Sequence, residues 1–152
     1  MSYIEQYFQE MLQVIDLIDQ RVIGEMVDKL VALGEIKNSD ETVKILLERE
    51  KLGSTGIGEG VAIPHGKSKD VKKITAVFAK SKEGVDFEAL DGEPVYLFFL
   101  LVAPESSTSE HIKALARISR LLKDSNFRKK LKMKQTAEEI LLAISEEDAR
   151  QP

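Results

Sequence analysis

The apolar residues of this chain follow two different spacings, and the spacing changes near residue 53 and again near residue 104. In the first and last thirds they recur every three to four residues, the period of a helix that buries one face. In the middle third they alternate or form short unbroken runs, which is typical of strands. Helices are predicted over residues 3–15, 21–33, 39–52, 109–123, 127–131 and 136–144. Strands are predicted over residues 14–18, 60–64, 74–79, 85–90 and 95–102.

Local signals support several of these elements. Ser39 is expected to cap the third helix, and Thr136 with Glu139 forms a capping box at the start of the last helix. The run 95–103 is apolar throughout, which favours a central strand covered on both faces. The prediction is a single α/β (α+β) domain, in which a mixed sheet of about five strands is flanked by helices.

The chain is expected to divide into three unequal parts. Residues 1–13 form an extra N-terminal helix, residues 14–147 form the folded domain, and residues 148–152 form a frayed tail. The length of 152 residues suits one domain with a sizeable core, and the pattern contains no internal repeat or linker.

Composition and charge narrow the function classes. The net charge of −4 argues against nucleic acid as a partner, because phosphate-binding surfaces are usually basic. The chain has no cysteine, which excludes disulfides and thiolate chemistry. The N-terminus lacks the pattern of a signal peptide, and no apolar run approaches the ~18 residues of a membrane span. We therefore expect a cytoplasmic protein that does not insert into a membrane.

The most distinctive segment is the glycine-rich stretch 53–66, which ends in Pro64-His65-Gly66. Four of the nine glycines fall in its first eight residues. Histidine is the only side chain with an unperturbed pKa near neutrality, so His65 is a candidate nucleophile, proton carrier or metal ligand. We expect Gly66 to leave the approach to this imidazole uncrowded for a large partner.

Nucleotide and metal sites are the alternatives for this segment. Gly66-Lys67-Ser68 resembles the end of a P-loop, but Gly60 lies one residue too far upstream. Residues 56–60 resemble a dinucleotide fingerprint, but the third glycine comes one residue early. His65 and His111 have no partner histidine at helical spacing, so a metal site would need residues that converge in space. The sequence predicts no cofactor and no metal.

Four other polar residues are candidates for the same site. His111 falls in the first turn of a predicted helix, where it is either an exposed helix-start residue or a neutral donor beside a phosphoryl group. Arg49, near the end of the helix before the glycine stretch, is either a solvated cation or a fork for phosphate oxygens. Ser54 and Thr55 are either ordinary loop residues or donors to an anion.

Three linked motifs resemble a known family. Arg49-Glu50, then Ser54-Thr55-Gly56-Ile57-Gly58, then Val61-Ala62-Ile63-Pro64-His65-Gly66 is similar to the signature of the fructose/mannitol class of IIA proteins. These proteins belong to the bacterial phosphoenolpyruvate-dependent sugar phosphotransferase system. The resemblance continues through residues 81–87, 90–95 and 103–105, resumes at His111, and covers about residues 14–144.

The resemblance implies a mannitol-IIA-like fold and a phosphotransferase that works through a phosphohistidine, without a metal. The family's phosphorylated histidine falls on His65, and its supporting arginine and second histidine fall on Arg49 and His111. Donors near Ser54 and Thr55 would add to the positive field around the phosphoryl group. The phosphoryl donor would be the phosphocarrier protein HPr, and the acceptor a cysteine of a IIB component. Because this chain has no cysteine, we expect that acceptor on a separate polypeptide.

Two branches of the family remain open at this point. Residues 81–95 look nearer the fructose branch, which favours a role in sugar uptake. A chain without fused transporter domains is also typical of the nitrogen-related regulators. Those act largely by binding regulatory target proteins, with phosphorylation as the switch.

Overall fold

The computed structural model describes residues 22–87 and 89–150. In chain order its elements are helices α2 (Val22–Ala32) and α3 (Ser39–Leu52), strands β1 (Gly56–Gly58), β2 (Val61–Ala62), β3 (His65–Ser68), β4 (Thr75–Val85) and β5 (Val95–Pro104), and helices α4 (Thr108–Leu121), α5 (Ser125–Met133) and α6 (Ala137–Arg150). They confirm the predicted α/β domain. The helix and strand predicted over residues 3–15 and 14–18 lie outside the described residues.

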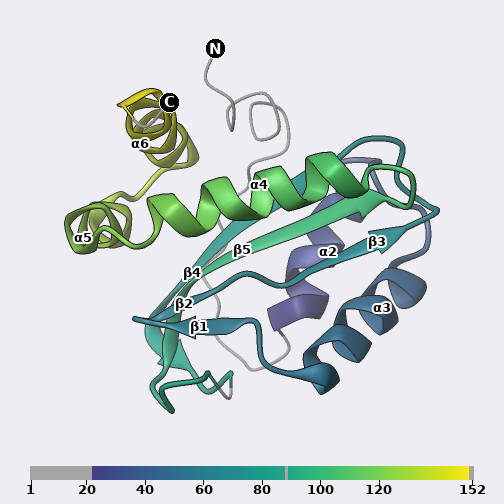
Figure 1. Ribbon diagram of the computed structural model, residues 1–152, viewed down its shortest axis with the longest axis horizontal. Helices are drawn as coiled ribbons and strands as arrows, with labels where there is room; N and C mark the ends of the chain where they lie inside the picture. Colours follow the sequence, from purple (N-terminus) through teal and green to yellow (C-terminus); the bar gives the residue numbers. More distant parts are fainter. Residues whose placement is uncertain (1–21, 88, 151–152) are drawn as a thin grey trace.

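Strand β5 is the centre of a mixed sheet (Figure 1). β4 pairs with it antiparallel along one edge, and β2 and β3 pair with it parallel along the other. β1 continues the sheet by pairing antiparallel with β2. All residues of β5 except Tyr96 are buried, as expected for a strand covered on both faces.

Strands β2 and β3 are two stretches of one ladder against β5. Val61 lies opposite Leu97 and His65 lies opposite Leu101, so the register is the same on both sides of the break. Pro64, in the break, has no N–H to donate to the ladder. Its carbonyl still accepts the Leu101 N–H at 2.9 Å. The chain therefore returns to the sheet at His65, although a proline precedes it.

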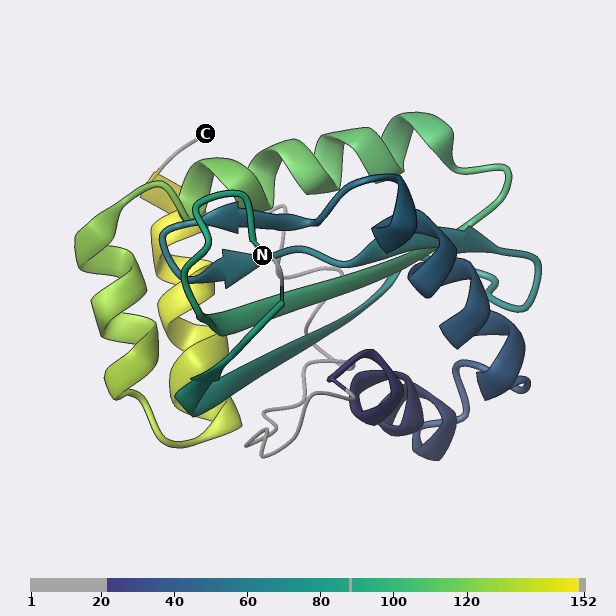
Figure 2. The ribbon, with the colours of Figure 1, turned by 90° about the horizontal axis from the view of Figure 1, so that it is seen from below.

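Helices cover both faces of the sheet (Figure 2). α4, α5 and α6 pack on one face, against β5 residues that include Phe99 and Leu101. α2 and α3 pack on the other face, against Phe98 and Leu100. Alternate residues of a strand point to opposite faces, so the unbroken apolar run of β5 supplies both cores.

The structure corrects two local predictions and confirms a third. Asn38, and not Ser39, caps α3, because its side chain accepts the Glu41 N–H at 3.2 Å. The strand predicted over residues 85–90 is wrong beyond Val85, where β4 ends, because the described residues 86, 87, 89 and 90 lie in a loop. The cap of the last helix is confirmed, since the Glu139 N–H donates to Thr136 Oγ1 at 3.1 Å.

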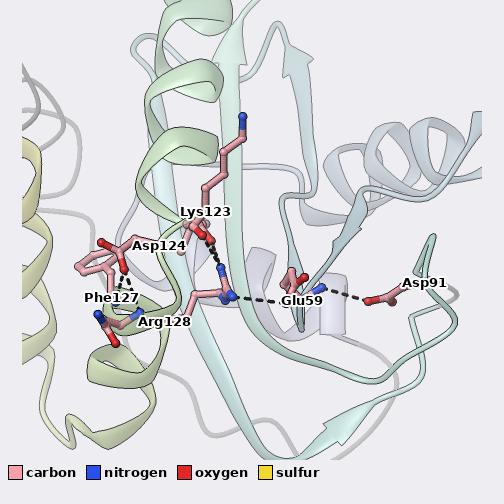
Figure 3. Close-up of polar contacts among 8 residues, drawn as sticks. Glu59, Asp91, Lys123, Asp124, Phe127 and Arg128 are labelled. Carbon is pink, nitrogen blue, oxygen red and sulfur yellow. Dashed lines mark hydrogen bonds and ion pairs between the residues drawn. The ribbon is translucent and has the colours of Figure 1, made fainter.

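A polar network ties the β1–β2 turn to α5 (Figure 3). Glu59, at the turn, accepts a hydrogen bond from Arg128 Nη2 at 3.3 Å, and its own N–H donates to Asp91 Oδ2 at 3.1 Å. Arg128 Nη1 also donates to the carbonyls of Leu122 and Lys123 at 2.8 and 2.9 Å. One guanidinium thus joins the C-terminal end of α4 to the hairpin that precedes β3.

Across residues 22–87 and 89–150, no helix combines the length and the apolar character that crossing a membrane requires.

The predicted frayed tail is wrong for residues 148–150, which belong to α6. Asp148 is fully buried, and its Oδ1 accepts from Arg117 Nε of α4 at 2.5 Å. Arg117 Nη2 also donates to the Asp148 carbonyl at 3.2 Å. This pair fastens the last helix to the helix that carries His111.

Replacing the buried carboxylate tests this correction. Asp148→Ala should lower the free energy of unfolding by about 3 kcal/mol, because it leaves the Arg117 guanidinium facing a site without its counter-charge. Urea unfolding measures the change. Glu146→Ala, an exposed carboxylate on the same helix, should stay within about 0.5 kcal/mol of the unsubstituted protein. Equal stability of the two variants would contradict this correction and support a frayed tail at the end of α6.

Candidate functional site

His65 is the first residue of β3, and its side chain is half-buried. Its ring nitrogen Nδ1 lies 2.8 Å from the carbonyl oxygen of Ile63. A carbonyl oxygen only accepts, so Nδ1 carries the proton and donates it. In the neutral ring the other nitrogen, Nε2, then has a free lone pair and is the nucleophilic atom.

The alternation of the strand sets the surroundings of this ring. Ile63 and His65 are two residues apart and point to the same face, the one covered by α4. Gly66 points to the opposite face, where an added Cβ would lie 3.1 Å from Ile45 Cγ2 and 3.4 Å from Leu46 Cδ2 of α3. The small residue therefore makes room for α3. That it also leaves the approach of a partner uncrowded stays a prediction.

His111 lies against His65. It is in the first turn of α4, where its N–H donates to the Ser107 carbonyl at 2.9 Å. The two imidazole centroids are 5.5 Å apart, with the ring planes at 61°. His111 is only 4% exposed, which rules out an exposed helix-start residue. Its Nδ1 is buried without a hydrogen-bond partner among the described residues, which is unusual for a polar atom in a protein interior.

Burial keeps both rings neutral near pH 7. Burial, with smaller contributions from His65 and the positive charge of Lys67, lowers the pKa of His111 to about 4. Burial also lowers the pKa of His65, while its bond to the Ile63 carbonyl opposes that shift. A neutral His65 is the form whose Nε2 can attack an electrophile.

Arg49 and Glu50 act on the same ring from the last turn of α3. The positive charge of Arg49 lowers the pKa of His65, and the negative charge of Glu50 raises it, so both lie within electrostatic reach. Arg49 Nη1 donates to the Gly53 carbonyl at 2.8 Å. The structure thus brings Arg49 and His111 to His65 from different elements.

Ser54 and Thr55 are engaged within the protein. The Thr55 N–H donates to Glu50 Oε2 at 3.1 Å, and the Thr55 hydroxyl donates to Glu50 Oε1. Ser54 Oγ donates to the Phe87 carbonyl at 3.2 Å and accepts the Gly56 N–H at 3.0 Å. Each hydroxyl has a single proton, and both protons are given to protein acceptors.

Two further groups at the site were not predicted as site residues, namely the Glu50 carboxylate and the Ile63 carbonyl. Glu50 stands beside Arg49 in the signature, and a buried loop needs an acceptor for its N–H groups, so its role had a signal in the sequence. The Ile63 carbonyl had none, because any residue has one. In the part of the chain that the structure describes, no three histidine or carboxylate side chains gather as a group that could hold a metal ion.

The structure thus places a neutral imidazole, with one tautomer selected by a backbone carbonyl, next to a second histidine and within electrostatic reach of an arginine. The chain belongs to the family of the phosphoenolpyruvate-dependent sugar phosphotransferase system, EIIA 2, whose sequence profile matches residues 7–147. Proteins of this family are phosphotransfer proteins.

Relatives from two branches of the family are similar to this chain. A nitrogen regulatory protein of Bradyrhizobium diazoefficiens is 50% identical over 109 residues, which are 72% of this chain and 71% of that protein. The fructose-specific EIIA component of Haloferax volcanii is 37% identical over 124 residues, 80% of each chain.

Solved structures agree with this fold. The nitrogen regulatory protein IIA-Ntr from Neisseria meningitidis has a TM-score of 0.80 at 35% identity, over 89% of this chain and 97% of its own. Enzyme IIA mannitol of Escherichia coli, solved in complex with phosphorylated enzyme IIB mannitol, has a TM-score of 0.74 at 25% identity, over 90% of this chain and 95% of its own. The expected mannitol-IIA-like fold is confirmed.

The low pKa of His111 predicts a pH dependence of stability. Between about pH 6.5 and pH 4 the unfolded chain binds a proton at His111 that the folded protein does not bind. The part of the stability that depends on a neutral His111 is therefore fully present above pH 6.5 and is lost as the pH falls through this window. Urea unfolding from pH 7.5 to 4.5 should show a smaller loss for His111→Gln than for the unsubstituted protein. Parallel losses, or a pKa near 6.5 for His111 by NMR, would contradict the burial argument.

Proposed function

We propose that His65 Nε2 is the phosphoryl acceptor of this protein, and that it carries the group from phospho-HPr to a cysteine of a IIB component. The observation that carries this proposal is the 2.8 Å hydrogen bond from Nδ1 to the Ile63 carbonyl. It leaves the Nε2 lone pair on a half-buried ring at the start of a strand.

The transfer needs no proton movement at this ring. The Nε2 lone pair forms a bond to phosphorus while the N–P bond of the donor phosphohistidine breaks, and that electron pair returns to the donor ring. The proton on His65 Nδ1 stays in its bond to the Ile63 carbonyl. In the second transfer a cysteine thiolate attacks phosphorus, and the electrons of the N–P bond return to Nε2. Positioning and charge stabilisation carry most of the catalysis in such transfers.

Arg49 and His111 are the groups that we assign to the phosphoryl oxygens. A guanidinium has five N–H donors, so the bond to Gly53 leaves others for charge-assisted bonds to phosphate. A neutral His111 supplies one N–H donor without repelling Arg49. We give these contacts to Arg49 and His111 rather than to the hydroxyls of Ser54 and Thr55, whose protons are committed elsewhere.

The IIB route is supported by the neighbour whose complex contains phosphorylated enzyme IIB mannitol, because that IIA protein shares this fold. The similarity to a fructose-specific EIIA component agrees with it. The HPr donor follows from the family's place in a phosphoenolpyruvate-dependent system.

A second candidate is a regulator that binds other proteins according to its phosphorylation state. The observation that favours it is the 50% identity to a nitrogen regulatory protein, higher than the 37% identity to the fructose component. Both candidates use the same phosphorylated histidine and differ in what the phosphoryl group does next.

Labelling by phospho-HPr tests the shared step. His65→Ala should take up no label, because it removes the acceptor nitrogen. Arg49→Ala should take up label about 10²–10³-fold more slowly, as when one transition-state donor is lost. Lys51→Ala, an exposed cation on the same turn, is the matched control and should keep the rate. Label on His65→Ala, or equal rates for Arg49→Ala and the control, would contradict these assignments.

Separating the two candidates requires the phosphorylated protein itself. For the transport role, label on His65 should pass to a fructose- or mannitol-type IIB protein and then to sugar. For the regulatory role, phosphorylated protein and the His65→Ala variant should recover different partners in a pull-down. Transfer to IIB with identical partner sets would leave only the transport role, and the opposite pair of results only the regulatory one.

A further inference from the structure

A continuous chain of hydrogen bonds runs from the end of α3 to the imidazole of His65. Both oxygens of the Glu50 carboxylate accept from Thr55, Oε2 from its N–H at 3.1 Å and Oε1 from its hydroxyl. The Thr55 carbonyl accepts the Ile63 N–H at 3.0 Å. The Ile63 carbonyl in turn accepts from His65 Nδ1 at 2.8 Å. Each residue of this chain is thus held by the one before it.

This series of hydrogen bonds fixes the backbone at Ile63. This residue lies between β2, which ends at Ala62, and β3, which begins at His65, so neither strand contains it. Its neighbour Pro64 cannot donate a hydrogen bond. The bond from the Ile63 N–H to Thr55 therefore holds the backbone at the residue whose carbonyl meets the imidazole.

Glu50 in turn secures Thr55. Thr55 follows Gly53, the C-cap of α3, and precedes the short strand β1, so it stands in the turn between two elements. Only 4% of its surface is exposed, and hydrogen bonds to a carboxylate are strong in such surroundings. The two carboxylate oxygens of Glu50 accept from the N–H and the hydroxyl of Thr55, and these two bonds fix Thr55 against α3.

We propose that Glu50 is a positioning residue, which acts through Thr55 and Ile63 to hold His65 in the tautomer with Nδ1 protonated and Nε2 free. The proposal rests on the function proposed above for His65. Glu50 makes no contact with the phosphoryl group in this account. Because the Nδ1 proton stays in place after transfer, the same chain orients the ring with and without phosphate. The negative charge of Glu50 also raises the pKa of His65 and so opposes the positive charge of Arg49, which lowers it.

Nitrogen-15 NMR of the imidazole tests the positioning role without phosphorylation. In the unsubstituted protein at pH 7.5 His65 should show one tautomer, with Nδ1 protonated. Glu50→Ala should show a mixture of the two tautomers and take up label from phospho-HPr at least 10-fold more slowly. Glu50→Gln should keep the tautomer and most of the rate, because its amide oxygen still accepts the Thr55 N–H. Glu48→Ala, an exposed carboxylate on the same helix, is the control.

A single unchanged tautomer and an unchanged rate in Glu50→Ala would overturn the proposal. So would a Glu50→Gln variant as defective as Glu50→Ala, because charge rather than position would then explain the effect. If Glu50→Ala does not fold, Thr55→Val takes its place, because it removes only the hydroxyl bond to Glu50. A partial mixture of His65 tautomers in this variant would support the proposal, and a single unchanged tautomer would contradict it. Failure of His65 to take up phosphate in the unsubstituted protein would remove the proposed function instead, and the tautomer result would stand apart from it.

Discussion

The hydrogen bond between His65 Nδ1 and the Ile63 carbonyl is the constraint on which the site depends. A neutral imidazole offers one basic nitrogen, and its tautomer decides which one. A backbone carbonyl selects the tautomer without adding charge, unlike a carboxylate partner, so the ring stays neutral. That carbonyl is available because the backbone groups of Ile63 face away from β5: its N–H donates to the Thr55 carbonyl, whereas the Pro64 carbonyl accepts from Leu101 of β5.

Electrostatics around this bond favour an incoming anion over a proton. Two imidazoles 5.5 Å apart would repel each other if both were charged, and burial lowers the pKa of both. Arg49 supplies a permanent positive charge, and Glu50 balances it while it binds Thr55. The site therefore combines a neutral imidazole with the positive charge of Arg49 and little competing protonation, which is the environment that the proposed phosphoryl transfer requires.

The helices and the central strand could be predicted from the sequence because each buries an apolar stripe or run that local spacing reveals. The signature around His65 likewise placed Arg49 and His111 as candidates, and the structure brings all three together. The predictions that the structure corrects depend on contacts between residues that are distant in the sequence. Proline and glycine around His65 indicate a break, but pairing with Leu101 restores a strand there. Asp148 falls in the polar segment that predicts a frayed tail, but its bond to Arg117 of α4 keeps it within the last helix.

The roles of the glycine and hydroxyl residues in the stretch 53–66 also depend on contacts that the local sequence does not reveal. Their composition suits an anion cradle, yet the structure uses Gly66 to admit α3 and the hydroxyl of Thr55 to bind Glu50. Nitrogen–phosphorus correlated NMR of the phosphorylated protein tests the central claim most directly. We predict phosphorus bonded to Nε2 of His65, with a proton retained on Nδ1. Phosphorus on Nδ1 of His65, or on His111, would contradict it.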